Sequence, residues 1–214
     1  MRIGILGTGD VGRALGDGFV ARGHEVKLGA RDESNEKAKA WADHHRERAS
    51  MGTFAEAAAF AEMAVLATLW SGTANAIRLA GPHNLAGKVV IDATNPLVFR
   101  ENGPPELALG FNDSGGEQIQ RWLAGAHVVK AFNTVGHAHM VDPRFPGGPP
   151  DMFICGNDDQ AKQTVADVCK SFGWPSIDVG GIECARLLEP MCILWVRHGI
   201  RTGSWNHAFK LLRR

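Results

Sequence analysis

Short apolar runs alternate along the chain with segments whose apolar residues recur at helical spacing. The runs predict strands over residues 2–6, 24–28, 62–68, 88–94, 127–134, 151–155 and 175–179. The helical spacing predicts helices over residues 13–20, 35–48, 54–60, 114–123, 158–172 and 182–200, the last kinked or restarted at Pro190. Strands that alternate with helices in this way are typical of an α/β protein with a mainly parallel sheet.

The first strand leads directly into a glycine turn with the spacing G-x-G-x-x-G, and a helix follows. Gly7 permits a sharp turn out of the strand, Gly9 lets a pyrophosphate approach the backbone, and Gly12 lets the helix pack closely on the strand. The free N–H groups of a helix N-terminus attract phosphate. The Asp10 carboxylate stands at this helix start, where it either faces the phosphate or turns away and caps the helix with its side chain. The pattern favours a dinucleotide site in a Rossmann-type, doubly wound fold over an ordinary strand–helix turn without a ligand.

The end of the second strand indicates which dinucleotide binds. Strands that bind NAD usually end in an acidic residue, which accepts hydrogen bonds from the ribose, but this chain has Gly29 there and Arg31 two residues later. A guanidinium binds a 2′-phosphate through paired hydrogen bonds. Ser34 and Lys37 are close enough in sequence to contribute a hydroxyl and a second charge. We therefore expect NADP(H) rather than NAD(H), although Asp32 and Glu33 could instead repel the phosphate or bind the ribose directly.

Further candidates follow the next two strands, because ligands of open α/β sheets bind at the carboxyl ends of the strands. Trp70 is either a cover for the cofactor or a tryptophan that packs at the edge of the core. Asn95 carries an amide that could bond a carboxamide or a ribose, and Pro96 fixes the turn after it. The paired histidines His137 and His139 lack an evident third ligand, so we expect no metal.

A connector rich in proline and glycine, residues 142–150, is the best boundary in the chain. It divides a dinucleotide-binding domain of residues 1–142 from a small α/β C-terminal lobe of residues 151–214. The helix predicted at 182–200 is apolar around most of its circumference, so it needs cover on several sides. The lobe is too small to provide that cover alone, and we expect the helix to pack on the first domain and on a second subunit, as in a homodimer.

Composition excludes several other classes of protein. The 214 residues include 23 basic and 23 acidic ones without a basic block, which argues against nucleic acid as a partner. No apolar run is long enough for a membrane span. The four cysteines are scattered, and the chain begins with a predicted strand, so we expect no signal peptide and a cytoplasmic protein. The absence of tyrosine excludes a tyrosine general acid.

Five segments resemble one known family: residues 3–12, 28–31, 128–134 (V-V-K-A-F-N-T), 155–159 and 188–190. The family is that of the NADPH-dependent coenzyme F420 reductases, which is related to the cytoplasmic domain of six-transmembrane ferric reductases. The resemblance implies hydride transfer between NADP(H) and a deazaflavin (coenzyme F420) or flavin. The residues expected at the cofactor, from the motifs and the resemblance together, are Gly7, Thr8, Gly9, Asp10, Val11, Gly12, Arg31, Ser34, Lys37, Thr68, Leu69, Trp70, Asn95, Pro96, Ala131 and Asn133.

The sequence departs from the family at two places. Ala30 stands where the family often has a hydroxyl residue, and Asn133–Val135 stands where some deazaflavin-using members have a histidine. No catalytic dyad is evident, which suits transfer between two ring cofactors, since these carry the chemistry themselves. An alcohol or hydroxyacid dehydrogenase would need a group that moves a proton. The remaining alternatives are a reductase of a small organic substrate and a non-catalytic NADP(H) sensor.

Overall fold

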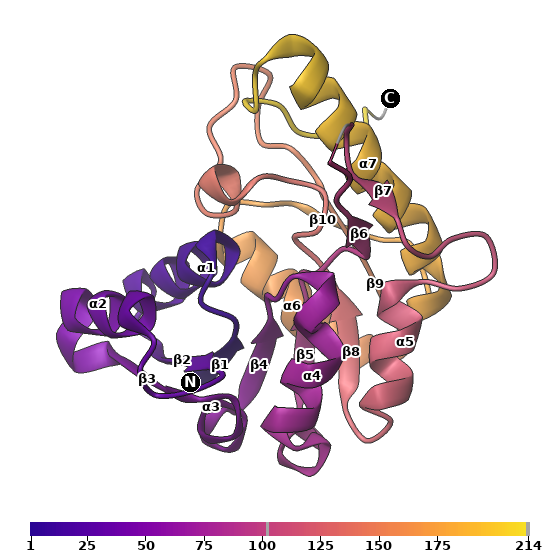
Figure 1. The fold of residues 1–214 in the computed structure, drawn as a ribbon. Helices are drawn as coiled ribbons and strands as arrows, with labels where there is room; N and C mark the ends of the chain where they lie inside the picture. Colours follow the sequence, from indigo (N-terminus) through magenta and orange to yellow (C-terminus); the bar gives the residue numbers. More distant parts are fainter. Residues whose placement is uncertain (102, 213–214) are drawn as a thin grey trace.

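A computed structural model describes residues 1–101 and 103–212, and it shows an eight-stranded sheet in the order β10-β9-β8-β5-β4-β1-β2-β3 (Figure 1). The pairs of neighbouring strands in this sheet are parallel, except that β9 runs antiparallel to β8. The strands are β1 (Arg2–Leu6), β2 (Glu25–Ala30), β3 (Ala49–Thr53), β4 (Met63–Leu66), β5 (Val89–Asp92), β8 (His127–Lys130), β9 (Met152–Gly156) and β10 (Ser176–Asp178). The predicted α/β fold with a mainly parallel, doubly wound sheet is confirmed.

Helices cover both faces of this sheet, so the strands have buried residues on either side. One apolar cluster joins the sheet to α1 (Asp10–Ala21), α2 (Glu36–His45) and α6 (Asp159–Ser171). The other joins it to α3 (Phe54–Phe60), α4 (Trp70–Ala80), α5 (Gly115–Trp122) and α7 (Ala185–Thr202). Successive residues of one strand alternate between the clusters: Ala64 belongs to the second cluster, and Met63 and Val65 to the first. This alternation is the two-residue period of a strand that is buried on both faces.

Four local features differ from the sequence-based expectations. Helix α4 was not expected, because much of its buried face consists of small or polar residues such as Thr73 and Ala76. Edge strand β3 was not expected either, because it is only partly buried. Strand β8 ends at Lys130 rather than at residue 134, because Phe132 adopts a φ of 61° and turns the chain. Helix α7 continues through Pro190 and does not restart there, since buried residues on both sides of the proline anchor it.

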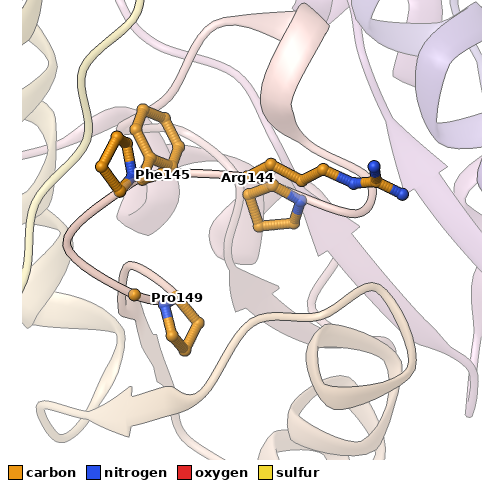
Figure 2. Close-up of a pocket in the computed structure, with 6 residues that line it drawn as sticks. Arg144, Phe145 and Pro149 are labelled. Atoms are coloured by element: carbon orange, nitrogen blue, oxygen red, sulfur yellow. The ribbon is translucent and has the colours of Figure 1, made fainter.

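The segment after the proline-rich connector continues the first part of the structure. Strand β9 pairs with β8, and the ring of Phe172 lies 4.9 Å from the ring of Phe19 in α1. The connector itself encloses a surface hollow of about 530 Å³, in which Arg144 extends away from Phe145 and Pro149 (Figure 2). This hollow offers mainly apolar rings and no group suited to chemistry. The division into domains 1–142 and 151–214 stays a prediction.

The remaining elements are short. A two-stranded hairpin forms from β6 (Leu97–Val98) and β7 (Glu106–Leu107), and it lies beside α7 (Figure 1). Short 3-10 helices occupy Arg46–Arg48, Pro82–Leu85, His137–His139 and Ile182–Cys184. The hairpin and the segment His137–His139 follow the carboxyl ends of β5 and β8, so they belong to the edge of the sheet where ligands of such folds bind.

Candidate dinucleotide site

The three glycines of the first turn have different surroundings. Gly7 has a φ of 134°, and a Cβ there would lie 2.2 Å from the carbonyl oxygen of Ala67. A Cβ on Gly12 would lie 2.2 Å from the carbonyl oxygen of Gly7. Around Gly9, by contrast, no atom of the described chain beyond its immediate chain neighbours lies within 4 Å of the Cβ position. The backbone itself therefore requires the first and third glycines, whereas the second borders open space.

Helix α1 begins without a side-chain cap, so the alternative in which Asp10 caps the helix is wrong. Gly9 occupies the N-cap position, and no side chain in the described part of the chain bonds to that helix end as a cap. The Asp10 carboxylate instead accepts a hydrogen bond of 2.5 Å from Arg13, which also donates to the Thr8 carbonyl oxygen at 2.7 Å. The first N–H groups of α1 consequently remain available to an anion.

A cleft of about 790 Å³ lies in front of this helix end, where β1, β2, β4 and β5 end. Ten of the predicted residues line it: Gly7, Thr8, Gly9, Asp10, Val11, Arg31, Thr68, Leu69, Trp70 and Asn95. Six do not: Gly12, Ser34, Lys37, Pro96, Ala131 and Asn133. The lining also includes residues that the sequence reasoning missed, among them Phe54, Asn75, Thr94 and His137. His137 was not among the residues expected at the cofactor, although the family resemblance implies that the loop after residue 134 forms the acceptor side.

Arg31 lies at one end of the cleft, directly after β2. Ser34 is bonded to Asp32 instead of facing the cleft, through its hydroxyl at 2.5 Å and its backbone N–H at 3.0 Å. These bonds hold the pKa of the Asp32 carboxyl below its usual range. Lys37 lines a separate surface hollow between α1 and α2, beside Trp41. Of the three residues expected at a 2′-phosphate, the structure thus brings Arg31 into the cleft and leaves the other two outside.

The position before Ala30, where NAD-binding strands usually carry an acidic residue, cannot hold a side chain here. A Cβ on Gly29 would lie 2.9 Å from the Cβ of Ala57 and 3.2 Å from the ring of Phe54. Both of those residues belong to α3, which packs against β2. A carboxylate at this position would therefore require helix α3 to move away from the sheet.

Asn95 lines the cleft and is bonded to a second asparagine, Asn133, which does not line it. Asn95 donates to the carbonyl oxygen of Asn133 at 2.9 Å, and Asn133 donates to Asn95 Oδ1 at 3.0 Å and to the Leu188 carbonyl oxygen at 2.9 Å. Asn133 is buried, so it supports Asn95 from behind the cleft wall. Ala131 is also fully buried, directly before the left-handed turn at Phe132.

Trp70 both lines the cleft and packs against a neighbouring helix, and its role as a cover for the cofactor stays a prediction. Its indole lines the cleft and stacks on Trp122 of α5, with ring centroids 5.8 Å apart and an interplanar angle of 22°. The stacking partner holds one face of the indole, so its orientation at the cleft is fixed by packing.

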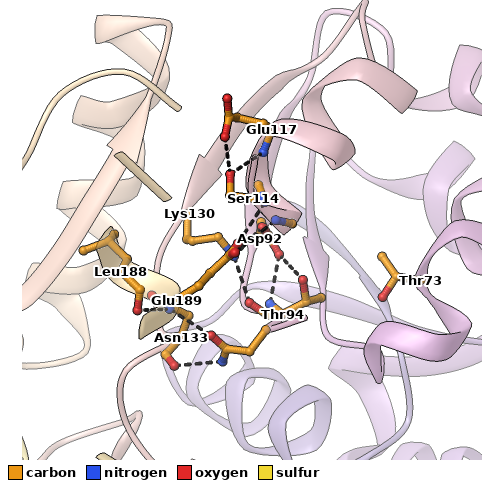
Figure 3. Close-up of polar contacts among 12 residues, drawn as sticks. Thr73, Asp92, Thr94, Ser114, Glu117, Lys130, Asn133, Leu188 and Glu189 are labelled. Carbon is orange, nitrogen blue, oxygen red and sulfur yellow. Dashed lines mark hydrogen bonds and ion pairs between the residues drawn. The ribbon is translucent and has the colours of Figure 1, made fainter. Parts of the chain in front are cut away.

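A buried ion cluster, defined by Asp92, Lys130 and Glu189, lies beside Thr94, the residue before Asn95 (Figure 3). Lys130 Nζ is 2.7 Å from Asp92 Oδ2 and 3.2 Å from Glu189 Oε1. Burial alone would lower the pKa of Lys130, but the two carboxylates raise it above its ordinary value, so the amine stays charged. The sequence reasoning missed this cluster, although a lysine inside an apolar strand was a usable signal.

Together the strand order and the cleft define a Rossmann-type α/β protein. Comparisons with known proteins identify its family. Residues 2–96 match the model of the family described as NADP oxidoreductase, coenzyme F420-dependent. The chain is 29% identical to the F420-dependent NADP reductase of Methanocaldococcus jannaschii, over 99% of this chain and 98% of that protein. It is 29% identical to rat metalloreductase STEAP3 over 88% of this chain, but it spans only 36% of STEAP3.

A solved structure agrees with these relatives. The crystal structure of an Arthrobacter sp. FB24 protein, assigned as an F420-dependent NADP-reductase, shares 40% of its sequence with this chain and superimposes with a TM-score of 0.93, covering all of both chains. The chain belongs to the family of coenzyme F420-dependent NADP oxidoreductases and is an NADP-dependent oxidoreductase. Among the residues that the structure describes, no helix combines the length and apolar character needed to cross a bilayer.

Proposed function

We propose that the cleft binds NADP(H) and that the protein transfers a hydride between this nucleotide and coenzyme F420 or a flavin. The observation that carries the proposal is that one cleft presents groups suited to each part of NADP(H). Open space at Gly9 and the uncapped start of α1 suit a pyrophosphate, while Arg31 suits a 2′-phosphate. Gly29 leaves no room for the acidic residue that would select NAD.

The nicotinamide half would then lie toward Trp70 and Asn95. The stacked indole offers a flat apolar surface, and the Asn95 amide is held by Asn133 at the rim. Bound NADP(H) supplies the hydride chemistry, and the chain's own residues orient the ring and exclude water from it. The acceptor assignment rests on the names of the archaeal and Arthrobacter relatives, which align over the full chain.

A reductase of a small imine or carbonyl compound is the second candidate, and His137 favours it. The imidazole of His137 is exposed and lines the same cleft as Thr94 and Asn95. Such a substrate needs a proton on its nitrogen or oxygen when it accepts a hydride, and histidine is the side chain best suited to supply one near neutral pH.

The experiment is to follow NADPH absorbance after adding coenzyme F420, FMN, a ferric chelate, or a panel of imines and ketones, each in a separate reaction. Oxidation with F420 or FMN that is unaffected by His137→Ala supports carrier exchange. Oxidation only with imines or ketones, abolished by His137→Ala, would replace the proposal with the second candidate. NADPH binding without oxidation by any compound would instead indicate a sensor and contradict both.

We also propose that a second copy covers the outer face of α7, giving a homodimer. Leu187 and Leu194 lie two turns apart on this helix, and both side chains are about 60% exposed. Phe111 is fully exposed, and it lines a surface hollow together with Leu187. Light scattering should give twice the chain mass, and Leu187→Asp with Leu194→Asp should give a monomer; a monomeric wild type would contradict this.

We place the protein in the cytoplasm, where its four free cysteines stay reduced.

A further inference from the structure

The buried ion cluster reaches the cleft through Thr94. Besides its two carboxylate partners, Lys130 Nζ donates to the Thr94 carbonyl oxygen at 2.8 Å. Asp92 Oδ1 accepts from the backbone N–H of Thr94 at 2.9 Å and from its hydroxyl at 2.7 Å. Three polar groups of one residue are therefore held by the cluster, and Figure 3 shows Thr94 directly beside Asp92. Thr94 and the next residue, Asn95, both line the cleft.

The cluster is also anchored on its far side. Glu189 comes from α7, and its two carboxylate oxygens accept from the backbone N–H groups of Gly115 and Gly116, each at 3.0 Å. These N–H groups form the start of α5, whose partial positive charge suits a carboxylate. The two acids and one lysine leave a net negative charge, which the helix end offsets. Strands β5 and β8 and helices α5 and α7 thus meet at one buried, ion-paired centre.

Stability alone is a weak reason for such a centre. Removing three charges from water costs several kcal/mol per ion, and a well-packed apolar trio in the same place is often as stable or more stable. Three apolar side chains could not, however, form hydrogen bonds with the N–H, hydroxyl and carbonyl groups of Thr94 and so fix its orientation. Hydride transfer is sensitive to such placement, because a misplacement of about 1 Å can cost about 100-fold in rate.

We propose that Lys130 and Asp92 are positioning residues, which hold the Thr94–Asn95 segment so that the inner cleft wall fits the nicotinamide half of the nucleotide. The inference rests on the proposed function. It concerns only the part of the cleft lined by Thr94 and Asn95, because Arg31 and the glycine turn belong to other elements and, within the described part of the chain, make no hydrogen bond to the cluster. A defect in the cluster should consequently weaken binding of the nicotinamide half and leave binding of the adenosine half unchanged.

The test uses the full chain and three variants. The triple variant Asp92→Asn, Lys130→Met, Glu189→Gln removes all three charges together, so no buried ion is left unpaired. Thr94→Val is a milder second variant, which removes the hydroxyl bond to Asp92 and leaves every charge in place. The matched control is Glu117→Gln, which breaks the Arg186–Glu117 pair between α5 and α7 without touching Thr94.

Two probes separate the halves of the nucleotide: adenosine 2′,5′-bisphosphate, which carries only the adenosine half, and NADPH. For the triple variant we expect an unchanged Kd for the bisphosphate within twofold, a Kd for NADPH raised about 5- to 10-fold, and a kcat lowered about 10- to 100-fold. Thr94→Val should follow the same pattern with smaller changes. Glu117→Gln should lower Tm while both Kd values and kcat stay close to wild type.

The outcomes are distinct from those that test the proposed function. If the wild type binds neither probe, the proposed function fails, and this inference fails with it. If the wild type binds and oxidises NADPH but Thr94→Val and the triple variant weaken both probes equally, or keep wild-type kcat, the cluster is merely structural and the inference is overturned. If the triple variant does not fold, Thr94→Val alone tests the inference, since it must still raise the Kd for NADPH more than the Kd for the bisphosphate.

Discussion

Replacing Gly9 with alanine adds one methyl group on the side of the turn that faces the cleft. The backbone of Gly9 has a φ of −73° and a ψ of −178°, which alanine adopts without strain. Beyond its immediate chain neighbours, the new Cβ would meet no atom of the described chain within 4 Å, so the folded protein has room for it. A pyrophosphate lying against the N–H groups of α1 would meet the same methyl group.

The expected magnitudes follow from this geometry. Alanine is a poorer N-cap than glycine by up to about 1 kcal/mol, but it also lowers the entropy of the unfolded chain by about 0.4–1 kcal/mol. Because these terms oppose each other, Tm should change by less than about 4 °C. Loss of one charge-assisted bond of about 1.5–3 kcal/mol should weaken NADPH binding by about 10- to 100-fold.

Gly12→Ala is the contrasting control. Its Cβ would lie 2.2 Å from the carbonyl oxygen of Gly7, so the backbone must shift at a cost of about 1–3 kcal/mol. The assay is a titration that follows NADPH fluorescence, together with thermal unfolding of each variant. Gly9→Ala should keep its Tm and lose affinity, whereas Gly12→Ala should lose Tm as well. Wild-type affinity in Gly9→Ala would refute the placement of the pyrophosphate at this turn.

Two further predictions concern titrating groups. The hydrogen bond from Arg186 holds the pKa of the Glu117 carboxyl below its ordinary 4.5. A lowered pKa stabilises the fold above pH 4.5, so Glu117→Gln should lower Tm by about 2 °C at pH 7, with the deficit shrinking below pH 4.5; a constant deficit would contradict this. Burial raises the pKa of the Cys155, Cys169 and Cys192 thiols to about 12. At pH 8 a thiol reagent should therefore label at most the half-buried Cys184 in the native protein and four thiols after unfolding; rapid native labelling of two or more would refute the buried placement.

The features that the sequence predicted correctly depend on neighbouring residues. Gly7, Gly9 and Gly12 lie within one turn, and their spacing carries the geometry of strand, turn and helix. The apolar runs likewise located the strands of the buried sheet, because each strand needs apolar residues on both of its faces. Residue 31 follows the second strand so closely that its place at the cleft was also predictable.

What the sequence could not show depends on contacts between distant segments. Lys37 is six residues from Arg31, yet the start of α2 turns it toward α1 and away from the cleft. Asn133 lies behind Asn95 because Leu188 of α7 accepts one of its hydrogen bonds. Glu189 contacts Gly115, 74 positions away in the sequence, and hydrophobic periodicity cannot predict a contact between residues so far apart. The left-handed turn at Phe132, which redirects the chain before His137, had no local signal in the sequence.

The central claim is that the cleft binds NADP(H) with its 2′-phosphate on Arg31. The most direct test measures Kd for NADPH and for NADH in the wild type, in Arg31→Ala, and in Lys37→Ala, which removes a nearby positive charge outside the cleft. Loss of charge-assisted bonds worth about 1.5–3 kcal/mol predicts NADPH binding about 10- to 100-fold weaker in Arg31→Ala, with NADH binding barely changed and Lys37→Ala close to wild type. An equal loss for both nucleotides in Arg31→Ala, or no loss for either, would contradict the account.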